Sequence, residues 1–150
     1  MQLPSRPYVA LYGSNTEYKW RVEAAARLQA HGVPCYDPAD QRWQQVTEQT
    51  GDQQQRLVDE LVTVQRHALT HAACVLFHMA RVEGNSPAAR FELGMLSCMP
   101  QLPVFLHVAP DTLGRNYVWA QARLSPNFQT FETMDHALDA VMDWYGKLGK

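Results

Sequence analysis

Short apolar runs alternate with helical patterns along this chain, and that alternation limits the possible folds more than any other feature. We predict buried strands at Tyr8–Tyr12, Ala73–Met79 and Pro103–Val108, because none of these runs contains Asp, Glu, Lys or Arg. A run that is apolar on both faces is typical of a parallel strand covered by helices on both sides. With further strands at Val33–Tyr36 and Phe128–Phe131, the pattern predicts an α/β fold: a doubly wound, five-stranded parallel sheet of the Rossmann or flavodoxin-like kind, with helices on both faces.

The helices are predicted from apolar residues spaced three or four positions apart. We predict four of them, which cover Thr16 or Glu17 to His31, the region of Leu57 to His71, Pro87 to Leu96, and the residues after the cap Thr133. Two other stretches are predicted to be surface loops, the glutamine-rich Gln41–Gln55 and Ala109–Tyr117. The most apolar strand, Ala73–Met79, is expected in the middle of the sheet.

Composition argues against several classes of protein. With 150 residues, 46% of them hydrophobic, the chain has enough apolar side chains for a single domain over residues 1–150. A net charge of −2 without a clustered basic face argues against nucleic-acid binding. No apolar run approaches the roughly 20 residues of a membrane span. No export signal is visible at the N-terminus, so we expect a cytoplasmic protein.

The cysteines and histidines do not indicate a metal site. Cys35, Cys74 and Cys98 lie in or beside apolar segments without the short paired spacing of metal ligands, and we predict that they are buried thiols. Only His67 and His71 stand four apart on one predicted helix, and two nitrogens alone do not make a metal site. We expect no metal and no organic cofactor.

Ligands of doubly wound sheets bind at the carboxyl ends of the strands, near the point where the strand order switches. Three loops fall at this edge, namely Gly13-Ser14-Asn15, Ala80–Ser86 and Ala109–Tyr117. Neither a Walker phosphate loop nor the three-glycine dinucleotide fingerprint is present. The turn at Gly13 is open to two interpretations: an anion or sugar site at a helix N-terminus, or an ordinary strand-to-helix turn.

A lone carboxylate, Glu92, stands between Phe91 and Leu93 in the second turn of the helix that follows Ser86. Removing a carboxylate from water costs free energy unless the group is partnered or used in chemistry. Arg90 is two residues away, so it points elsewhere on the helix. Glu92 is therefore a candidate nucleophile, or else a structural carboxylate that bonds a neighbouring helix or subunit.

Four short motifs follow the predicted strands in order. They are Tyr12-Gly13-Ser14-Asn15, Tyr36-Asp37-Pro38, Ser86-Pro87 with Phe91-Glu92-Leu93-Gly94, and Arg115-Asn116-Tyr117-Val118. In this combination, from about Tyr8 to Trp144, the chain resembles the nucleoside 2-deoxyribosyltransferase-like family, which includes related nucleoside 5′-monophosphate N-glycosidases. The resemblance implies that Glu92 attacks the anomeric carbon of a nucleoside. A carboxylate suits this reaction because it can trap an oxocarbenium-like sugar covalently.

The resemblance also bears on the substrate. It implies an Asp six residues before the glutamate in members that take free nucleosides, and a Ser there in hydrolases of 5′-monophosphates; this chain has Ser86. A serine at a helix N-terminus suits a phosphate. The same residue is also an ordinary helix N-cap. Both interpretations stay open.

One position departs from the family pattern. The resemblance implies an acid that protonates the leaving base eight residues before the third strand, where this chain has Gln65, and the strand's usual leading Asp is Ala73. Proton transfer of this kind commonly contributes about 10²–10⁴ in rate. Either another group assists, with His67 and His71 the nearest candidates, or the protein binds nucleotides without rapid turnover.

We therefore expect an enzyme that cleaves or transfers at the N-glycosidic bond of a (deoxy)nucleoside or nucleoside 5′-monophosphate, its partner being this small molecule. The alternatives are a catalytically weak or silent nucleotide-binding module of the same fold, and a flavodoxin-like electron carrier, for which no flavin signature is visible. The predicted catalytic residues are Glu92, Gln65 and Tyr12. The predicted substrate-binding residues are Gly13, Ser14, Asn15, Asp37, Ser86 and Arg115.

The predicted site is shallow, because it lies at the strand ends of a small sheet, and the resemblance implies that a neighbouring subunit completes it. The chain also has four tryptophans, more large apolar side chains than its predicted elements need. We therefore predict a homodimer or a larger even-numbered assembly. We expect it to pair through the helix that bears Glu92 and Leu96 and through the helix Gln53–Thr70.

Overall fold

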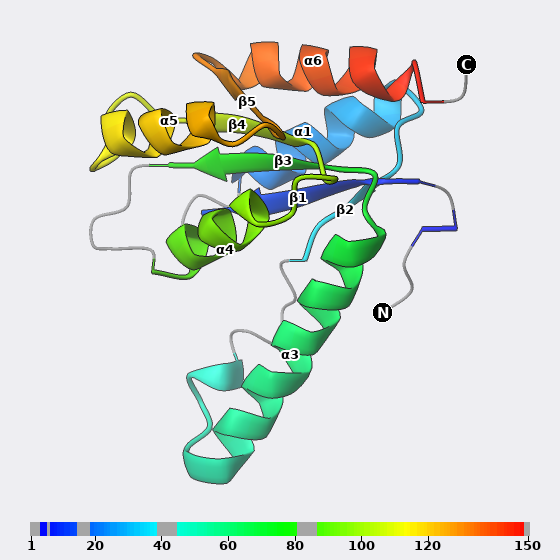
Figure 1. The fold of residues 1–150 in the computed structure, drawn as a ribbon. Helices are drawn as coiled ribbons and strands as arrows, with labels where there is room; N and C mark the ends of the chain where they lie inside the picture. Colours follow the sequence, from blue (N-terminus) through cyan, green and yellow to red (C-terminus); the bar gives the residue numbers. More distant parts are fainter. Residues whose placement is uncertain (1–3, 6, 15–18, 39–44, 81–86, 149–150) are drawn as a thin grey trace.

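The computed structural model describes residues 4–5, 7–14, 19–38, 45–80 and 87–148, and Figure 1 shows its ribbon. Within these residues the elements follow in the order β1 (Val9–Gly13), α1 (Lys19–Ala30), β2 (Cys35–Tyr36), α3 (Gly51–His71), β3 (Cys74–Met79), α4 (Pro87–Ser97), β4 (Val104–Val108), α5 (Arg115–Leu124), β5 (Phe128–Phe131) and α6 (Met134–Tyr145). The predicted α/β fold, a parallel sheet between two layers of helices, is confirmed.

The sheet has the strand order β2-β1-β3-β4-β5, and all its neighbouring strands are parallel. β3 lies in the middle, as predicted, and all six of its residues are buried. The chain moves outward from β1 to β2 and then crosses back to β3 on the other side of β1. The carboxyl ends of β1 and β3 therefore flank the switch point, where doubly wound sheets bind their ligands.

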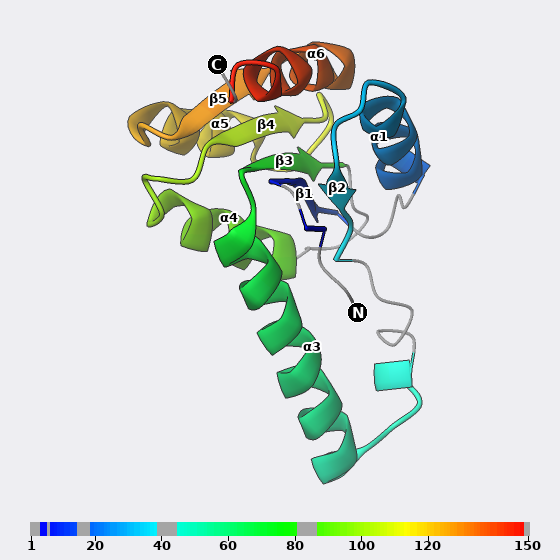
Figure 2. The ribbon, with the colours of Figure 1, turned by 90° about the vertical axis from the view of Figure 1, so that its right-hand side faces the viewer.

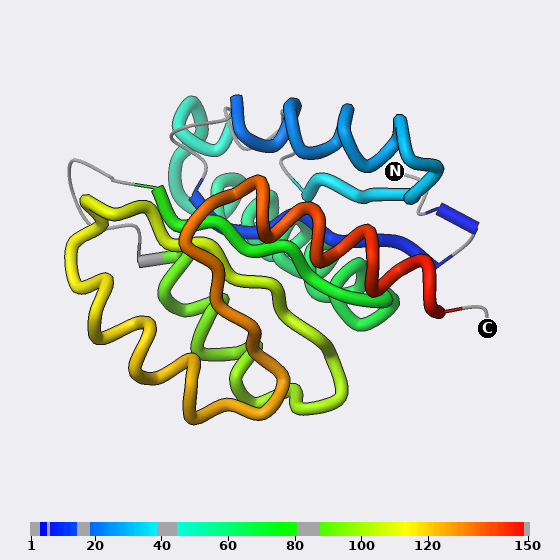
Figure 3. Tube along the Cα trace, turned by 90° about the horizontal axis from the view of Figure 1, so that it is seen from above, coloured from blue at the N-terminus to red at the C-terminus, as the bar shows by residue number. Residues whose placement is uncertain are grey.

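Each face of the sheet packs against its own set of helices. On one face, Tyr12, Phe77 and Leu106 belong to the apolar cluster that also holds buried residues of α3, α4 and α5. On the other face, Leu11 and Leu76 pack with buried residues of α1 and α6. Figure 3 shows α1 and α6 on this second side, and the two helices contact each other. Alternate residues of one strand thus serve opposite layers.

Helix α3 extends away from the sheet. In Figures 1 and 2 its C-terminal end lies beside the sheet, while its N-terminal half projects outward. Its buried residues, Leu61, Ala68 and Leu69, all lie from its midpoint onward. Although α3 has 21 residues, neither it nor any other helix in the described part of the chain is long and apolar enough to cross a membrane.

The predicted loop Gln41–Gln55 is wrong at its C-terminal end, because α3 begins at Gly51. Residues 41–44 lie outside the described residues, so the first part of that prediction is untested. Glutamine favours helix nearly as well as lysine or glutamate do. A helix that projects into solvent needs no apolar stripe along its first turns, which is why a polar run there indicated a loop.

Helix α5 is missing from the sequence prediction, and the predicted loop Ala109–Tyr117 is wrong from Arg115 onward. Gly114, with a φ of 75°, makes the turn before the helix, and Val118 and Ala122 are its buried residues. These two residues, four apart, form the helical signal. This signal is weak because two large apolar residues of the helix, Tyr117 and Leu124, are 68% and 80% exposed, so apolar side chains do not mark the buried face alone.

Two local predictions have opposite outcomes. Thr133 caps α6 as predicted, since its side-chain oxygen accepts a 3.2 Å hydrogen bond from the main-chain N–H of His136. The prediction of three buried thiols holds only for Cys74. Cys35 is half-buried, and Cys98 is exposed just after the end of α4.

Candidate active site

The turn at the end of β1 brings the chain very close to β3. A Cβ atom on Gly13 would lie 1.9 Å from the carbonyl oxygen of His78, and the φ of Gly13 is 119°, so no other residue fits without rearrangement. The next main-chain N–H, of Ser14, donates a 2.9 Å hydrogen bond to that same carbonyl. The carbonyl of Ser14 accepts from Trp20 Nε1 at 3.0 Å. The main chain of this turn is thus engaged within the fold.

A cavity of about 270 Å³ lies between α3 and α4, next to Tyr12 near the end of β1. Its lining residues are Tyr12, Val62, Gln65, Arg66, Leu69, Ala88, Phe91, Glu92 and Met95. The α3 residues and the α4 residues each follow the spacing of one helix face, so two helical walls meet over the strand. The structure therefore brings the three predicted catalytic residues, Tyr12, Gln65 and Glu92, into one cavity.

Glu92 is half-buried on the α4 wall. Among the residues that the structure describes, none makes a hydrogen bond or an ion pair with its carboxylate. Burial raises the pKa of Glu92 to about 7, against the opposing effect of the positive charge of Arg21. The carboxylate thus changes its charge near neutral pH, in the range where acid, base or nucleophile chemistry operates.

Tyr12 faces the same cavity as a neutral hydroxyl. It donates a 2.7 Å hydrogen bond to the main-chain oxygen of Gln65 on α3. Burial is the main cause that raises the pKa of Tyr12, and the negative charge of Glu92 raises it further. The charge of Glu92 is thus felt at Tyr12, and the phenol stays neutral beside the carboxylate.

The wall opposite Glu92 carries Gln65 and Arg66. Arg66 is exposed and makes no hydrogen bond or ion pair with any described residue. Sequence reasoning missed it, although its position next to Gln65 on a predicted helix was a usable signal. His67 and His71, the candidates for assisting the leaving group, do not line the cavity. Both are exposed, and His71 Nδ1 lies 2.8 Å from the carbonyl oxygen of His67.

Asp37 and Arg115, both predicted to bind substrate, are held by other residues outside the cavity. Asp37 accepts a 2.9 Å hydrogen bond from Arg21. Arg115 donates to Glu132 at 2.7 Å, and its guanidinium lies 3.9 Å from the ring centre of Trp119. Neither Asp37 nor Arg115 is among the described residues that line the cavity. The predicted binding residues Asn15 and Ser86 lie outside the described residues.

Two buried histidines lie on the other side of the sheet from the cavity. His78 on β3 and His107 on β4 stack with ring centres 4.9 Å apart, and their Nδ1 atoms are 2.9 Å apart. One ring therefore donates its proton to the other. Burial lowers the pKa of His78 to about 4. In the described part of the chain, no three His, Cys, Asp or Glu side chains come together in a way that suits a metal ion.

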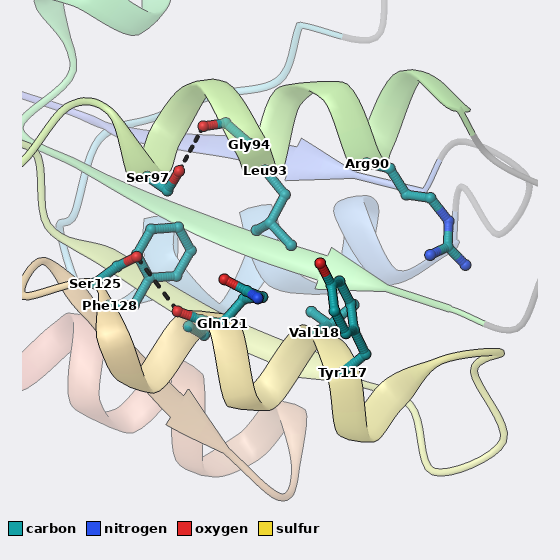
Figure 4. A pocket seen from close by; sticks show the side chains of 10 residues that line it. Arg90, Leu93, Gly94, Ser97, Tyr117, Val118, Gln121, Ser125 and Phe128 are labelled. Carbon is teal, nitrogen blue, oxygen red and sulfur yellow. Dashed lines mark hydrogen bonds between the residues drawn. The ribbon is translucent and has the colours of Figure 1, made fainter.

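A second groove, of about 350 Å³, runs between α4 and α5, and Figure 4 shows the side chains that line it. Its two serines already donate hydrogen bonds to helix carbonyls, Ser97 to Gly94 and Ser125 to Gln121. Arg90, at one end, donates to the carbonyl of Leu113. None of the described residues that line it is a carboxylate or a histidine. The smaller cavity beside Glu92 is therefore the candidate active site.

Comparison with known proteins identifies the family of the chain. Residues 6–109, more than half of the chain, match the model of a family described as nucleoside 2-deoxyribosyltransferase like. The match spans Tyr12, Gln65 and Glu92 and ends just after β4, so the motif at Arg115 lies beyond it. No curated protein matches the chain. The chain belongs to the nucleoside 2-deoxyribosyltransferase-like family.

Proposed function

We propose that this protein cleaves or transfers at the N-glycosidic bond of a (deoxy)nucleoside or nucleoside 5′-monophosphate, with Glu92 as the nucleophile. One observation carries the proposal: Glu92 is a half-buried carboxylate in a cavity, and no described residue bonds to it. A structural carboxylate at such a position would be expected to have a partner, because its desolvation otherwise costs free energy. Family membership supports the nucleoside class of substrate.

In the proposed reaction a carboxylate oxygen of Glu92 attacks C1′ of the sugar while the bond between C1′ and the base nitrogen breaks. The electron pair of that bond stays on the base, which takes up one proton. Water then attacks C1′ of the glycosyl ester, which releases the sugar, restores the Glu92 carboxylate and yields one proton. If a second base attacks in place of water, the result is transfer. No group other than the carboxylate and these reactants is needed for the balance.

The α3 wall would face the departing base. The carboxamide of Gln65 can donate a hydrogen bond to a base but cannot give up a proton. Arg66, beside it on the same wall, brings a positive charge and further N–H donors. Such donors stabilise charge that develops on a leaving group without a proton transfer. We assign Arg66 this electrostatic role, with water supplying the proton.

The alternative is a catalytically weak or silent nucleotide-binding module. It is favoured by Gln65, since Glu92 is the only carboxylate among the described residues that line the cavity and no second acid faces it. The two functions differ in one measurement. A silent module binds a nucleoside or nucleotide in calorimetry but releases no free base over hours, whereas the enzyme releases base with each turnover.

The experiment is incubation with a panel of nucleosides and 5′-monophosphates, followed by chromatography for free base and sugar. Glu92→Gln keeps the shape of the side chain but removes the nucleophile, so we expect base release to be lost while the circular dichroism spectrum stays unchanged. The control is Glu48→Gln, which changes an exposed glutamate outside the cavity. A Glu92→Gln protein that keeps most of its activity would remove Glu92 from the mechanism.

We also propose that the protein works as a homodimer or a larger even-numbered assembly. Phe91 and Val62 line the cavity and are 67% and 38% exposed, so a second copy could cover apolar surface there. Leu96, on the same helix as Phe91, is fully buried in the chain's own core, so the exposed side chains of that helix would make the contact. A stable pairing should bury about 1,200–2,000 Å². Light scattering tests it, and a single species of 17.1 kDa would contradict it.

A further inference from the structure

The outer edge of β1 is paired with β2 over a very short length. The register joins only Val9 with Cys35 and Ala10 with Tyr36, after which β2 ends. Pro38 follows soon after and has no N–H to donate. Because Val9 N–H donates toward β2 and Ser14 N–H donates toward β3, the carbonyls of Leu11 and Gly13 face the side that β2 leaves open.

The guanidinium of Arg21, from α1, takes the place of the missing strand. Its Nη1 donates to the carbonyl of Leu11, and its Nη2 donates to the carbonyl of Gly13 at 2.9 Å. Asp37, just past the end of β2, pairs with Nη1 at 2.9 Å. The Arg21 side chain is only 2% exposed. A charge buried this deeply is retained only with such partners, so Arg21 ties the end of β1 to the end of β2.

This clamp lies beside the cavity, because the two carbonyls that Arg21 holds belong to the neighbours of Tyr12, and Tyr12 lines the cavity together with Glu92. Among the described residues, the other charged or titratable groups that line the cavity with Glu92 are Tyr12 on β1 and Arg66 on α3, and Arg21 on α1 acts on Glu92 from the clamp beside the cavity. Of these three groups, Arg21 is the one whose charge lowers the pKa of Glu92 against the effect of burial. The interaction acts in both directions. Burial lowers the pKa of Arg21, and the negative charge of Glu92 raises it.

We propose, on the basis of the proposed function, that Arg21 is a positioning residue for Glu92. It fixes the carboxyl end of β1 next to the cavity, and it supplies a buried positive charge that favours the ionised, nucleophilic form of the carboxylate. Asp37 is then the partner that holds Arg21 in place and not a ligand of the substrate. This assignment replaces the substrate-binding role that the Tyr36-Asp37-Pro38 motif suggested.

The first test measures the charge and does not depend on activity. Protein labelled with ¹³C at glutamate carboxyls is titrated by NMR, and the Glu92 signal is assigned with Glu92→Gln. We expect Arg21→Gln to move the Glu92 midpoint upward by about one pH unit or more. Arg27→Gln is the matched control on the same helix, because Arg27 pairs with Asp135 and Asp139, and it should leave the midpoint unchanged. An unchanged midpoint in folded Arg21→Gln overturns the proposal.

If Arg21→Gln does not fold, Asp37→Asn takes its place. Removing the neutralising carboxylate strengthens the effect of Arg21, so the Glu92 midpoint should fall; a midpoint equal to that of the wild type overturns the proposal. Arg21→Lys tests the geometry, because a lysine keeps the charge but cannot hold both carbonyls as a fork. We expect a small change in midpoint and a tenfold to hundredfold loss in kcat, with KM within about twofold.

The outcomes separate this inference from the proposed function. If Glu92→Gln keeps base release, the proposed function fails, and the titration still reports whether Arg21 acts on Glu92. If Glu92→Gln abolishes base release while Arg21→Lys keeps the wild-type kcat and Arg21→Gln leaves the Glu92 midpoint unchanged, the function stands and the positioning role fails.

Discussion

The hydroxyl of Tyr12 donates a 2.7 Å hydrogen bond to the main-chain carbonyl of Gln65, and so joins the end of β1 to α3 across the candidate active site. Because its raised pKa keeps the phenol neutral, this bond persists at any pH at which the enzyme would work. The strand and the wall that carries Gln65 are thereby fixed to each other. Glu92 stands on the other wall, held by the buried Ala89 and Leu96 of its own helix. The cavity thus has preorganised walls.

Restoring an acid opposite Glu92 should raise turnover. Gln65 lines the cavity with Glu92, and a carboxylic acid at position 65 can protonate the leaving base, which an amide cannot. We expect Gln65→Asp to increase kcat by about tenfold or more, at the low end of what general acid catalysis contributes. Gln65→Asn is the control for the shorter side chain. If Gln65→Asp binds the substrate but turns it over no faster than Gln65→Asn, water or another residue already serves as the acid.

Replacing Glu92 should stabilise the fold above neutral pH. The folded-state pKa of about 7 lies above the ordinary value of 4.5, so between these values the folded state binds more protons than the unfolded state. Stability from this group is therefore present at low pH and is lost as pH rises to about 7. We expect Glu92→Gln to be more stable than the wild type at pH 8 by up to about 3 kcal/mol, and equally stable at pH 4. Urea unfolding at the two pH values measures the difference, and equal differences at both would contradict the sign.

The buried histidine pair should act in the opposite direction. His78 has a folded-state pKa of about 4, below its ordinary value of 6.5, so the unfolded state binds more protons between these values. The stability that neutral His78 contributes to the fold is therefore fully present above pH 6.5 and is lost as pH falls toward 4. We expect the free energy of unfolding of the Glu92→Gln protein to fall by up to about 3 kcal/mol over this range. The variant is used because it lacks the Glu92 carboxylate, whose effect on stability runs in the opposite direction. Adding His78→Leu should flatten that slope. A slope that survives in the double variant would assign the loss to other groups.

The buried strands and the partly buried carboxylate of Glu92 could be predicted from the sequence because each rests on a local signal. An apolar run reports a strand covered on both faces, and Glu92 between Phe91 and Leu93 reports a desolvated carboxylate. The role of Asp37 could not be predicted in this way. Its partner Arg21 lies 16 positions away, and their pairing depends on where β2 ends. Arg115 likewise has a distant partner, because Glu132 lies 17 positions away, between β5 and α6, and no local pattern reports that pairing.

Gly13 should tolerate substitution far less well than Gly32, a glycine that is required only for its positive φ. In Gly13→Ala, the new Cβ would meet the His78 carbonyl at 1.9 Å, and the φ of 119° would be strained as well. In Gly32→Ala, the φ of 70° is strained, but no atom of the described residues lies within 4 Å of the new Cβ. We expect Gly32→Ala to cost about 1 kcal/mol and Gly13→Ala more than about 3 kcal/mol, measured by urea unfolding. Because the displaced strand end also carries Tyr12, a folded Gly13→Ala protein should lose base release, while Gly32→Ala keeps it. Equal losses of stability in the two variants would mean that the main chain near His78 moves at little cost, and that the close approach of Gly13 to β3 does not fix the position of Tyr12.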